Sequence, residues 1–294
     1  MNKNNDIFDK ENVYEVIGGF SDYVPDQEKK RVPWWMWVII GFLTLATTIL
    51  LVVYFMNKKH QYEYAMHSST TEMRADTAVW FNNTDKSLPP CTLVSDTLID
   101  SIHLQIFTPY NTVPTLHVGA LDTSDNDVIF CSFAADLGYE NGKIIGAFVN
   151  EGEPISWGGG RKLGYCAILE ENVTLGVSEN SPLFEQAIEQ GGYFFRQYPA
   201  VDNGVMVKNN PKNAAFRRAL CMLNGKVCVV ATFDRVLMND FATILVQLGV
   251  ENAIFLTGGN AEGWYRTEDG TFHRLGEKYI KGNSNVNYIV FRAQ

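Results

Sequence analysis

A pair of glycines near the C-terminal end marks the clearest candidate binding site in the sequence. The segment from Asn239 to Arg266 has the pattern of a helix, a tight turn, a buried strand and then Gly258-Gly259. Backbone amides at the end of a strand can bind an anion or a phosphate oxygen, as turns and helix N-termini do in other proteins. The sequence therefore predicts an anion-binding turn here, with an ordinary tight turn as the alternative.

Two adjacent arginines could supply the charge for such a site. Arg217 and Arg218 lie in a strand expected over Phe216 to Cys221. Neighbouring residues of a strand point to opposite faces, so at most one of the two can face a pocket. Arginine binds phosphate or carboxylate through two parallel hydrogen bonds, which makes it the natural partner of the glycine turn. The alternative is a solvated charge at a sheet edge.

Aromatic residues stand next to glycines at two places. Gly191 and Gly192 precede Tyr193, and Trp264 and Tyr265 follow the later glycine pair. Aromatic faces suit the C–H surfaces of a sugar, so these five residues are candidates for lining a sugar-sized pocket. A cluster of core aromatics explains the rings equally well.

Standard catalytic and cofactor motifs are absent from the sequence. It contains no GxSxG nucleophile turn, no HExxH zinc motif, no phosphate-binding Walker loop and no dinucleotide fingerprint. The five cysteines do not have metal-ligand spacing, and the histidines are scattered. We therefore expect no metal and no cofactor. The net charge of −9 also argues against a nucleic-acid partner, because a surface that follows phosphates needs a basic excess.

A membrane is the first partner that the sequence indicates. Residues 34–56 are 23 consecutive residues without a charge, flanked by interfacial tryptophans and a tyrosine. At about 1.5 Å per residue such a helix spans a hydrocarbon core of roughly 30 Å. A cleaved signal peptide fits poorly, because 33 residues precede the apolar segment and no small-residue cleavage site follows it. Lys29, Lys30 and Arg31 favour a cytoplasmic N-terminus and a periplasmic or extracellular C-terminal domain.

Four regions follow from this reading. Residues 1–33 form a cytoplasmic tail, 34–56 the transmembrane helix, 57–90 a juxtamembrane stalk and linker, and 91–294 the globular domain. Strands are expected within that domain at residues 114–121, 127–134, 143–149, 164–169, 173–177, 226–232, 253–257 and 287–291. Amphipathic helices are expected after Ser181-Pro182 and from Asp240 to Leu248. We therefore predict an α+β fold with a mixed β-sheet core and a few flanking helices, with an antiparallel sheet as the alternative.

The order of these motifs resembles the phosphodiester glycosidase family. Its members carry a glycine-rich segment ahead of an arginine-bearing strand, then a helix and a Leu-Gly pair. A strand that ends in Leu-Asp-Gly-Gly-x-Ser follows. The matching stretches here are Gln190 to Phe194, Arg217 to Cys221 and Phe241 to Ala261. The resemblance covers roughly residues 125–265. It implies a domain that hydrolyses a sugar–phosphate diester or a related glycoside.

One departure from the family pattern bears on catalysis. Thr257 stands where the family has Asp, and Asn260 or Ala261 stands at the following serine position. A carboxylate there would be a natural general acid or base, whereas threonine cannot take a proton near neutral pH. Glu262 is the nearest carboxylate that could take over, and Asp136, Glu140 and Glu189 are the next candidates.

The resemblance and the residues together give two functional hypotheses. In the first, a membrane-anchored enzyme hydrolyses a sugar phosphodiester, with Thr257 and Glu262 at the catalytic centre. Its predicted substrate-binding residues are Arg217, Arg218, Gly258, Gly259, Asn260, Gly191, Gly192, Tyr193, Trp264 and Tyr265. In the second, a catalytically degenerate domain on a membrane stalk binds carbohydrate or cell envelope through the same pocket. A scaffold whose tail recruits a partner is a third alternative.

Overall fold

The structure, a computed structural model, describes residues 33–66, 78–80, 83–158, 162–276 and 283–294. The chain divides into two units, Met1–Phe55 and Met56–Gln294. The expected cytoplasmic tail up to residue 32, with its Lys29–Arg31 cluster, lies outside the described residues, as do residues 67–77 and 81–82 of the expected stalk.

Helix α1 (Trp34–Met66) contains the apolar segment. Its stretch Trp34–Tyr54 is long and apolar enough to cross a membrane, a property that membrane spans and signal sequences share. The threonine hydroxyls inside the stretch donate to backbone carbonyls three or four residues earlier, so they need no partner outside the helix. The helix continues beyond residue 56.

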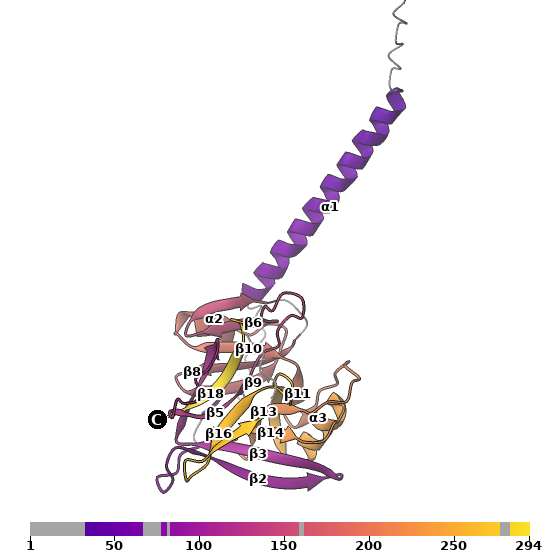
Figure 1. Ribbon diagram of the computed structural model, residues 1–294. Helices are drawn as coiled ribbons and strands as arrows, with labels where there is room; N and C mark the ends of the chain where they lie inside the picture. Colours follow the sequence, from indigo (N-terminus) through magenta and orange to yellow (C-terminus); the bar gives the residue numbers. More distant parts are fainter. Residues whose placement is uncertain (1–32, 67–77, 81–82, 159–161, 277–282) are drawn as a thin grey trace, which may run out of the picture. The chain divides into compact units, whose positions relative to one another are not determined.

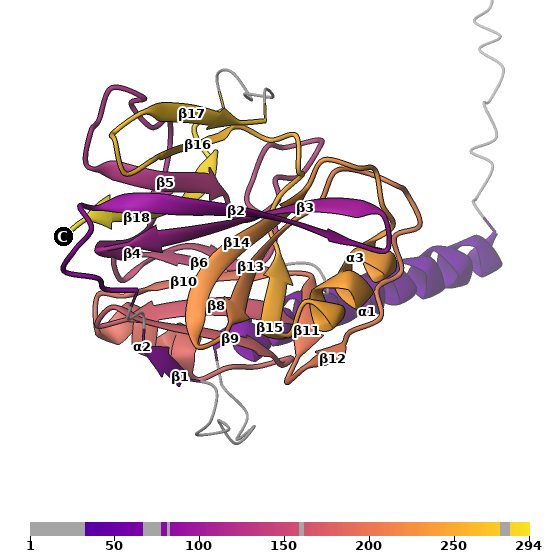
Figure 2. The same cartoon turned by 90° about the horizontal axis from the view of Figure 1, so that it is seen from below.

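Three β-sheets make up the second unit (Figures 1 and 2). The first has six strands in the order β1 (Ala78–Trp80), β9 (Asn172–Val177), β8 (Gly164–Leu169), β10 (Tyr193–Gln197), β6 (Ala147–Asn150) and β7 (Glu153–Trp157). The second has seven: β12 (Val205–Met206), β11 (Pro199–Asp202), β15 (Val250–Phe255), β13 (Arg218–Leu223), β14 (Lys226–Thr232), β3 (Ile102–Tyr110) and β2 (Cys91–Ile99). The third has five: β17 (Phe272–Leu275), β16 (Gly263–Arg266), β5 (Val128–Phe133), β18 (Asn287–Ala293) and β4 (Thr112–Val118).

The predicted α+β class is confirmed, with one correction to the sheets. We expected a mixed core, but every strand pairing in the described part of the chain is antiparallel. The reason is local: tight turns join many consecutive strands, and such turns can only produce antiparallel pairs. Between β13 and β14 the turn is Asn224-Gly225, whose positive φ angles of 54° and 70° fit the favoured two-residue hairpin.

The inner faces of the three sheets share one hydrophobic core. Phe107 from the second sheet packs against Phe130 and Tyr265 from the third, at ring-centroid distances of 5.9 and 5.1 Å. Phe148 and Phe195 bring the first sheet into the same core. The outer faces are covered separately, and Figure 2 shows the two short helices there. Helix α2 (Leu183–Glu189) packs on the first sheet, and α3 (Met238–Gln247) packs on the second.

Contacts with the folded unit begin before the expected domain start at residue 91. Strand β1 lies in the segment that was expected to be stalk, and it pairs with β9 of the folded unit. The side-chain amide of buried Asn83 donates to the carbonyl oxygens of Pro109 and Val227, at 2.9 and 2.8 Å. All five cysteines are unbridged and buried within strands, where they act as small apolar side chains.

Phe107 provides a test of the shared core. Phe107→Ala removes a ring that joins two sheets and leaves a cavity, so we expect it to lower the free energy of unfolding by about 3 to 5 kcal/mol. The matched control is Phe233→Ala, because the Phe233 ring is half exposed and its loss should cost about 1 kcal/mol or less. Urea unfolding of the full chain in detergent measures both. Equal losses would contradict the assignment of Phe107 to a core between sheets.

Candidate functional site

The glycine pair lies in a tightly packed turn after β15. The Thr257 amide donates to the Ala134 carbonyl at 3.1 Å, and the Gly259 amide donates to the Phe216 carbonyl at 3.1 Å. A Cβ at Gly259 would lie 2.4 Å from the Phe216 carbonyl carbon, so only glycine fits. One of the two amides expected to bind an anion is therefore already used within the protein.

Arg218 lies beside this turn, but its guanidinium faces the protein interior. Its Nη1 donates to Ser132 Oγ at 2.8 Å and to the Ala261 carbonyl at 3.4 Å, and its Nη2 donates to the Gly259 carbonyl at 3.2 Å. Only 2% of the residue is exposed. Burial lowers the pKa of Arg218 to about 10, so the group stays charged at neutral pH. These contacts hold the turn in place, and the buried guanidinium is not accessible to a ligand from solvent.

Arg217 and Glu262, the other charged residues expected at the site, have partners elsewhere. The Arg217 guanidinium donates to the carbonyls of Val236 and Asn213, and neither acceptor belongs to the glycine turn. Glu262 is nearly buried and forms an ion pair with Arg274 at 2.8 Å. Asn260 is exposed at the tip of the turn.

The aromatic residues expected to stack on a sugar differ in accessibility. Trp264 is 1% exposed and packs against Phe272 and Tyr288, so it cannot contact a ligand in this structure; this expectation is corrected. Tyr265 stacks on His273 at 4.8 Å, and the Tyr193 hydroxyl lies 3.5 Å from Glu151.

Gly191 and Gly192 have a structural explanation. Gly191 has a φ of 71° in the turn that follows α2, a conformation that favours glycine. A Cβ on Gly192 would lie 2.5 Å from the Leu169 side chain and 2.7 Å from the Ile168 carbonyl oxygen. Both residues therefore fit the tight connection between α2 and β10.

A carboxylate that the motif did not include lies next to Thr257. The Thr257 hydroxyl is 2.9 Å from Asp136 Oδ1 and 3.0 Å from the Ala134 carbonyl. The side-chain amide nitrogen of Gln197 lies 3.4 Å from the same hydroxyl. The side-chain carbonyl of Gln197 accepts the Tyr198 backbone amide at 3.0 Å. Asp136 follows β5 as Thr257 follows β15, so two strand ends bring the pair together.

Lys162 completes this group. Its ammonium lies 2.6 Å from Asp136 Oδ2 and 5.2 Å from the centre of the Tyr198 ring. The Lys162 side chain is 3% exposed, whereas the Asp136 side chain is 33% exposed and accessible to a ligand. Burial disfavours the ionised carboxylate, but the charge of Lys162 and the hydrogen bonds around Asp136 outweigh it. The pKa of Asp136 is therefore lowered.

Asn287 fixes the backbone that carries Asp136. Its side-chain carbonyl accepts the Ala135 amide at 2.7 Å, and its side-chain amide donates to the Ala135 carbonyl at 3.1 Å. Asn287 is fully buried, so both bonds are shielded from water. The Asn287 backbone carbonyl also accepts the Ala134 amide at 3.1 Å, so Asn287 holds both residues between the end of β5 and Asp136.

The group Asp136, Lys162, Gln197 and Thr257 can accept a proton and hold a polar ligand. An ionised carboxylate with one face exposed is suited to act as a base. Within the described ranges no cluster of three or more histidine, cysteine or acidic side chains is arranged to hold a metal ion. Sequence reasoning placed Asp136 only among the reserve candidates. Its signal in the sequence was an acidic residue shortly after a buried strand, Val128 to Phe133. Thr257 likewise follows a buried strand, β15.

The Lys162 ion pair gives a prediction about proton binding. In Lys162→Met the burial of Asp136 is no longer opposed by a charge, so we expect the pKa of Asp136 to rise above its ordinary value. The wild-type pair contributes stability above the unfolded-state pKa of about 3.9, and this is lost as pH falls through the lowered folded-state pKa. In the variant the pH dependence of stability is reversed. The raised pKa of folded Asp136 means that stability is lost as pH rises through that pKa.

An NMR titration of the Asp136 carboxyl carbon measures this shift. Asp269 is the internal control, because hydrogen bonds from Thr267 and Thr271 hold its pKa at about 2 and Lys162 is not among its partners. A pKa of Asp136 that stays low in Lys162→Met would show that the ion pair does not control the carboxylate.

Comparison with known proteins shows a likeness in fold. No protein family matches the chain, and no curated protein does. The zebrafish N-acetylglucosamine-1-phosphodiester alpha-N-acetylglucosaminidase catalytic domain, auto-inhibited by its pro-peptide, is similar at 13% identity and a TM-score of 0.51, covering 74% of this chain and 87% of that one. A hypothetical protein from Synechocystis is similar at 13% identity and a TM-score of 0.52, covering 69% and 62%. The chain thus shares a distant fold relationship with a phosphodiester glycosidase domain.

Proposed function

We propose that this protein is a membrane-anchored phosphodiester glycosidase whose base is Asp136. The observation that carries the proposal is the 2.9 Å contact between Asp136 Oδ1 and the Thr257 hydroxyl. It places a carboxylate, carried by the end of β5, next to the position after β15 where the family motif has one. The fold likeness to a phosphodiester glycosidase domain supports the substrate class.

The proposed reaction needs one base. Asp136 takes a proton from a water molecule, and the water oxygen forms a bond to the anomeric carbon of the sugar. The bond from that carbon to the phosphate oxygen breaks, and the phosphate leaves with the electron pair. A phosphate monoester leaves as a stable anion, with a second pKa of about 6, so no carboxylic acid has to protonate it. Lys162 holds Asp136 in its ionised form.

A second function, binding without cleavage, is favoured by the ion pairs. Lys162 already neutralises Asp136, and Arg274 neutralises Glu262. A base held in an ion pair is weakened, because a proton must compete with the neighbouring charge. The group around Asp136 would then bind carbohydrate or cell envelope, on a domain carried by a membrane stalk.

Turnover of phosphodiesters by the full chain in detergent distinguishes the two functions. We expect the wild type to hydrolyse members of a panel of aryl and sugar 1-phosphodiesters. Asp136→Asn should lower kcat by about 10²- to 10⁴-fold, the usual worth of a positioned base. Glu262→Gln and Asp269→Asn are matched controls that remove other carboxylates, and kcat should stay within a few-fold of wild type.

Two outcomes would contradict the hydrolase. One is turnover that survives Asp136→Asn but is lost in Glu262→Gln, which would return the base to Glu262. The other is a wild type without turnover on the whole panel. If panel members then still raise the melting temperature, the binding function is supported instead.

We further propose that the apolar helix stays attached and spans a membrane, with the N-terminus cytoplasmic and the folded domain periplasmic or extracellular. Protease added to intact cells should then remove the domain and leave a small protected fragment. The bias of Lys29–Arg31 and the length of the C-terminal part support this orientation. If the domain resists protease until the membrane is permeabilised, the orientation is the opposite one, with the folded domain cytoplasmic. A domain released without the helix would identify a signal sequence.

A further inference from the structure

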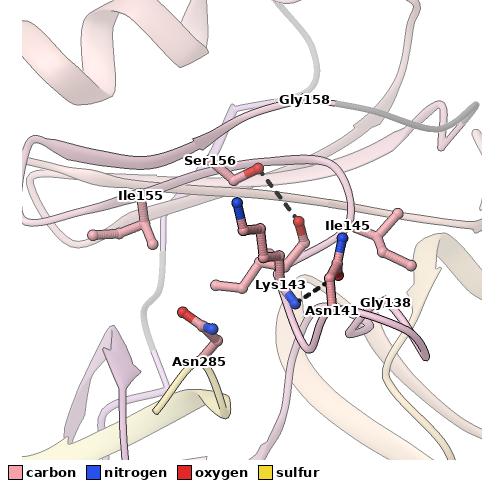
Figure 3. Close-up of a pocket in the computed structure, with 9 residues that line it drawn as sticks. Gly138, Asn141, Lys143, Ile145, Ile155, Ser156, Gly158 and Asn285 are labelled. Carbon is pink, nitrogen blue, oxygen red and sulfur yellow. Dashed lines mark hydrogen bonds between the residues drawn. The ribbon is translucent and has the colours of Figure 1, made fainter. Parts of the chain in front are cut away.

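A pocket lies beside the hairpin that begins at Asp136. Its volume is about 630 Å³, within the usual range of small-molecule sites. Figure 3 shows its walls, which come from the hairpin, from β7 and its end, and from the segment before β18. The lining residues are Gly138, Asn141, Lys143, Ile144, Ile145, Ile155, Ser156, Gly158 and Asn285.

Hydrogen bonds hold the hairpin in place. The Gly138 amide donates to the Lys143 carbonyl at 2.8 Å, and the Ile145 amide donates to the Asp136 carbonyl at 2.8 Å. The side-chain amides of Asn283 and Asn285 both donate to the Gly142 carbonyl, at 3.2 and 3.1 Å. The wall of the pocket is therefore formed before a ligand binds, which lowers the cost of binding.

The lining presents hydrogen-bond donors and acceptors in separate groups. Asn141 Oδ1 already accepts the Lys143 amide at 3.0 Å, so its side-chain NH₂ remains to donate alongside the Lys143 ammonium. Ser156 donates its hydroxyl proton to the Ile144 carbonyl at 3.4 Å, and Asn285 uses its NH₂ on Gly142. Their oxygens remain as acceptors.

The charge of the lining is a single positive one. Lys143 has no carboxylate within 4.0 Å among the described residues, and none of the nine lining residues is acidic. In a chain of net charge −9 this is a local exception. One ammonium beside an amide NH₂ matches a ligand group with one negative charge, whereas a phosphate monoester carries close to two.

The rest of the lining suits a sugar ring. Ile144, Ile145 and Ile155 provide an apolar surface for C–H groups, and the Ser156 and Asn285 oxygens can accept from hydroxyls. Tyr139 follows Gly138 at the pocket and is fully exposed, so its ring is free to stack on a second sugar.

We infer that this pocket binds a carbohydrate that carries one carboxylate per sugar, a hexuronate unit of an acidic glycan. Lys143 and the Asn141 amide bind the carboxylate, and the oxygens of Ser156 and Asn285 bind hydroxyls. The inference goes beyond the proposed hydrolysis at Asp136 and does not depend on it, because it concerns binding alone.

Calorimetry on the full chain in detergent tests the inference, with digalacturonate as the probe. Galactobiose is the neutral counterpart, and galactose 1-phosphate offers a phosphate in place of the carboxylate. We expect digalacturonate to bind at least about tenfold more tightly than either, as a charge-assisted hydrogen bond implies. Lys143→Gln should remove this preference, and Lys143→Arg should keep it. Lys212→Gln removes an exposed lysine outside the pocket and should change nothing.

Asn141→Asp is a further variant, because it replaces the amide donor with a negative charge of nearly the same shape. It should weaken digalacturonate binding at least as much as Lys143→Gln while leaving galactobiose unaffected. Equal affinity for digalacturonate and galactobiose would overturn the inference, and so would an affinity unchanged in Lys143→Gln. Tighter binding of galactose 1-phosphate than of digalacturonate would show that the pocket prefers a phosphate to a carboxylate, and this would also overturn the inference.

Discussion

Arg218 carries a positive charge into the space between two sheets, where water cannot solvate it. A buried charge is tolerated only when hydrogen bonds replace its hydration. Here Ser132 on β5 and the carbonyls of Gly259 and Ala261 provide the oxygens. These partners come from different parts of the chain, so the guanidinium ties β5, β13 and the turn after β15 together. Together with the bond from the Thr257 amide to the Ala134 carbonyl, these contacts hold the ends of β5 and β15 side by side, where Asp136 and Thr257 meet.

Strands with a clear local signal were predictable from the sequence. Residues 164–169 and 226–232 form β8 and β14 as expected, because both are apolar runs bounded by turn residues. The hairpin of β2 and β3 was missed. Its turn, Asp100-Ser101, has positive φ angles of 48° and 65° without the usual Asn-Gly pair. Exposed polar residues also interrupt the alternation of β2, so packing on other strands defines it.

The candidate site was predictable only in part, because tertiary contacts complete it. The sequence placed Thr257 at the critical strand end and one arginine near the glycine turn. It could not place Asp136, which is 121 residues away from Thr257 along the chain. Trp264 was misjudged for a related reason: in β16 successive side chains alternate between faces, and the face that takes Trp264 is buried by Phe272 and Tyr288.

The contact between Asp136 and Thr257 also gives a physical reason for the threonine. An aspartate at position 257 would put a second carboxylate within hydrogen-bonding distance of Asp136, and two such groups cannot both ionise without a large cost. Threonine instead offers a hydroxyl that can donate to Asp136, which favours the ionised form. The threonine at position 257 and the lowered pKa of Asp136 are thus parts of one arrangement. The same hairpin that begins at Asp136 reaches Gly138 two residues later, at most about 7 Å on, where the pocket that contains Lys143 begins.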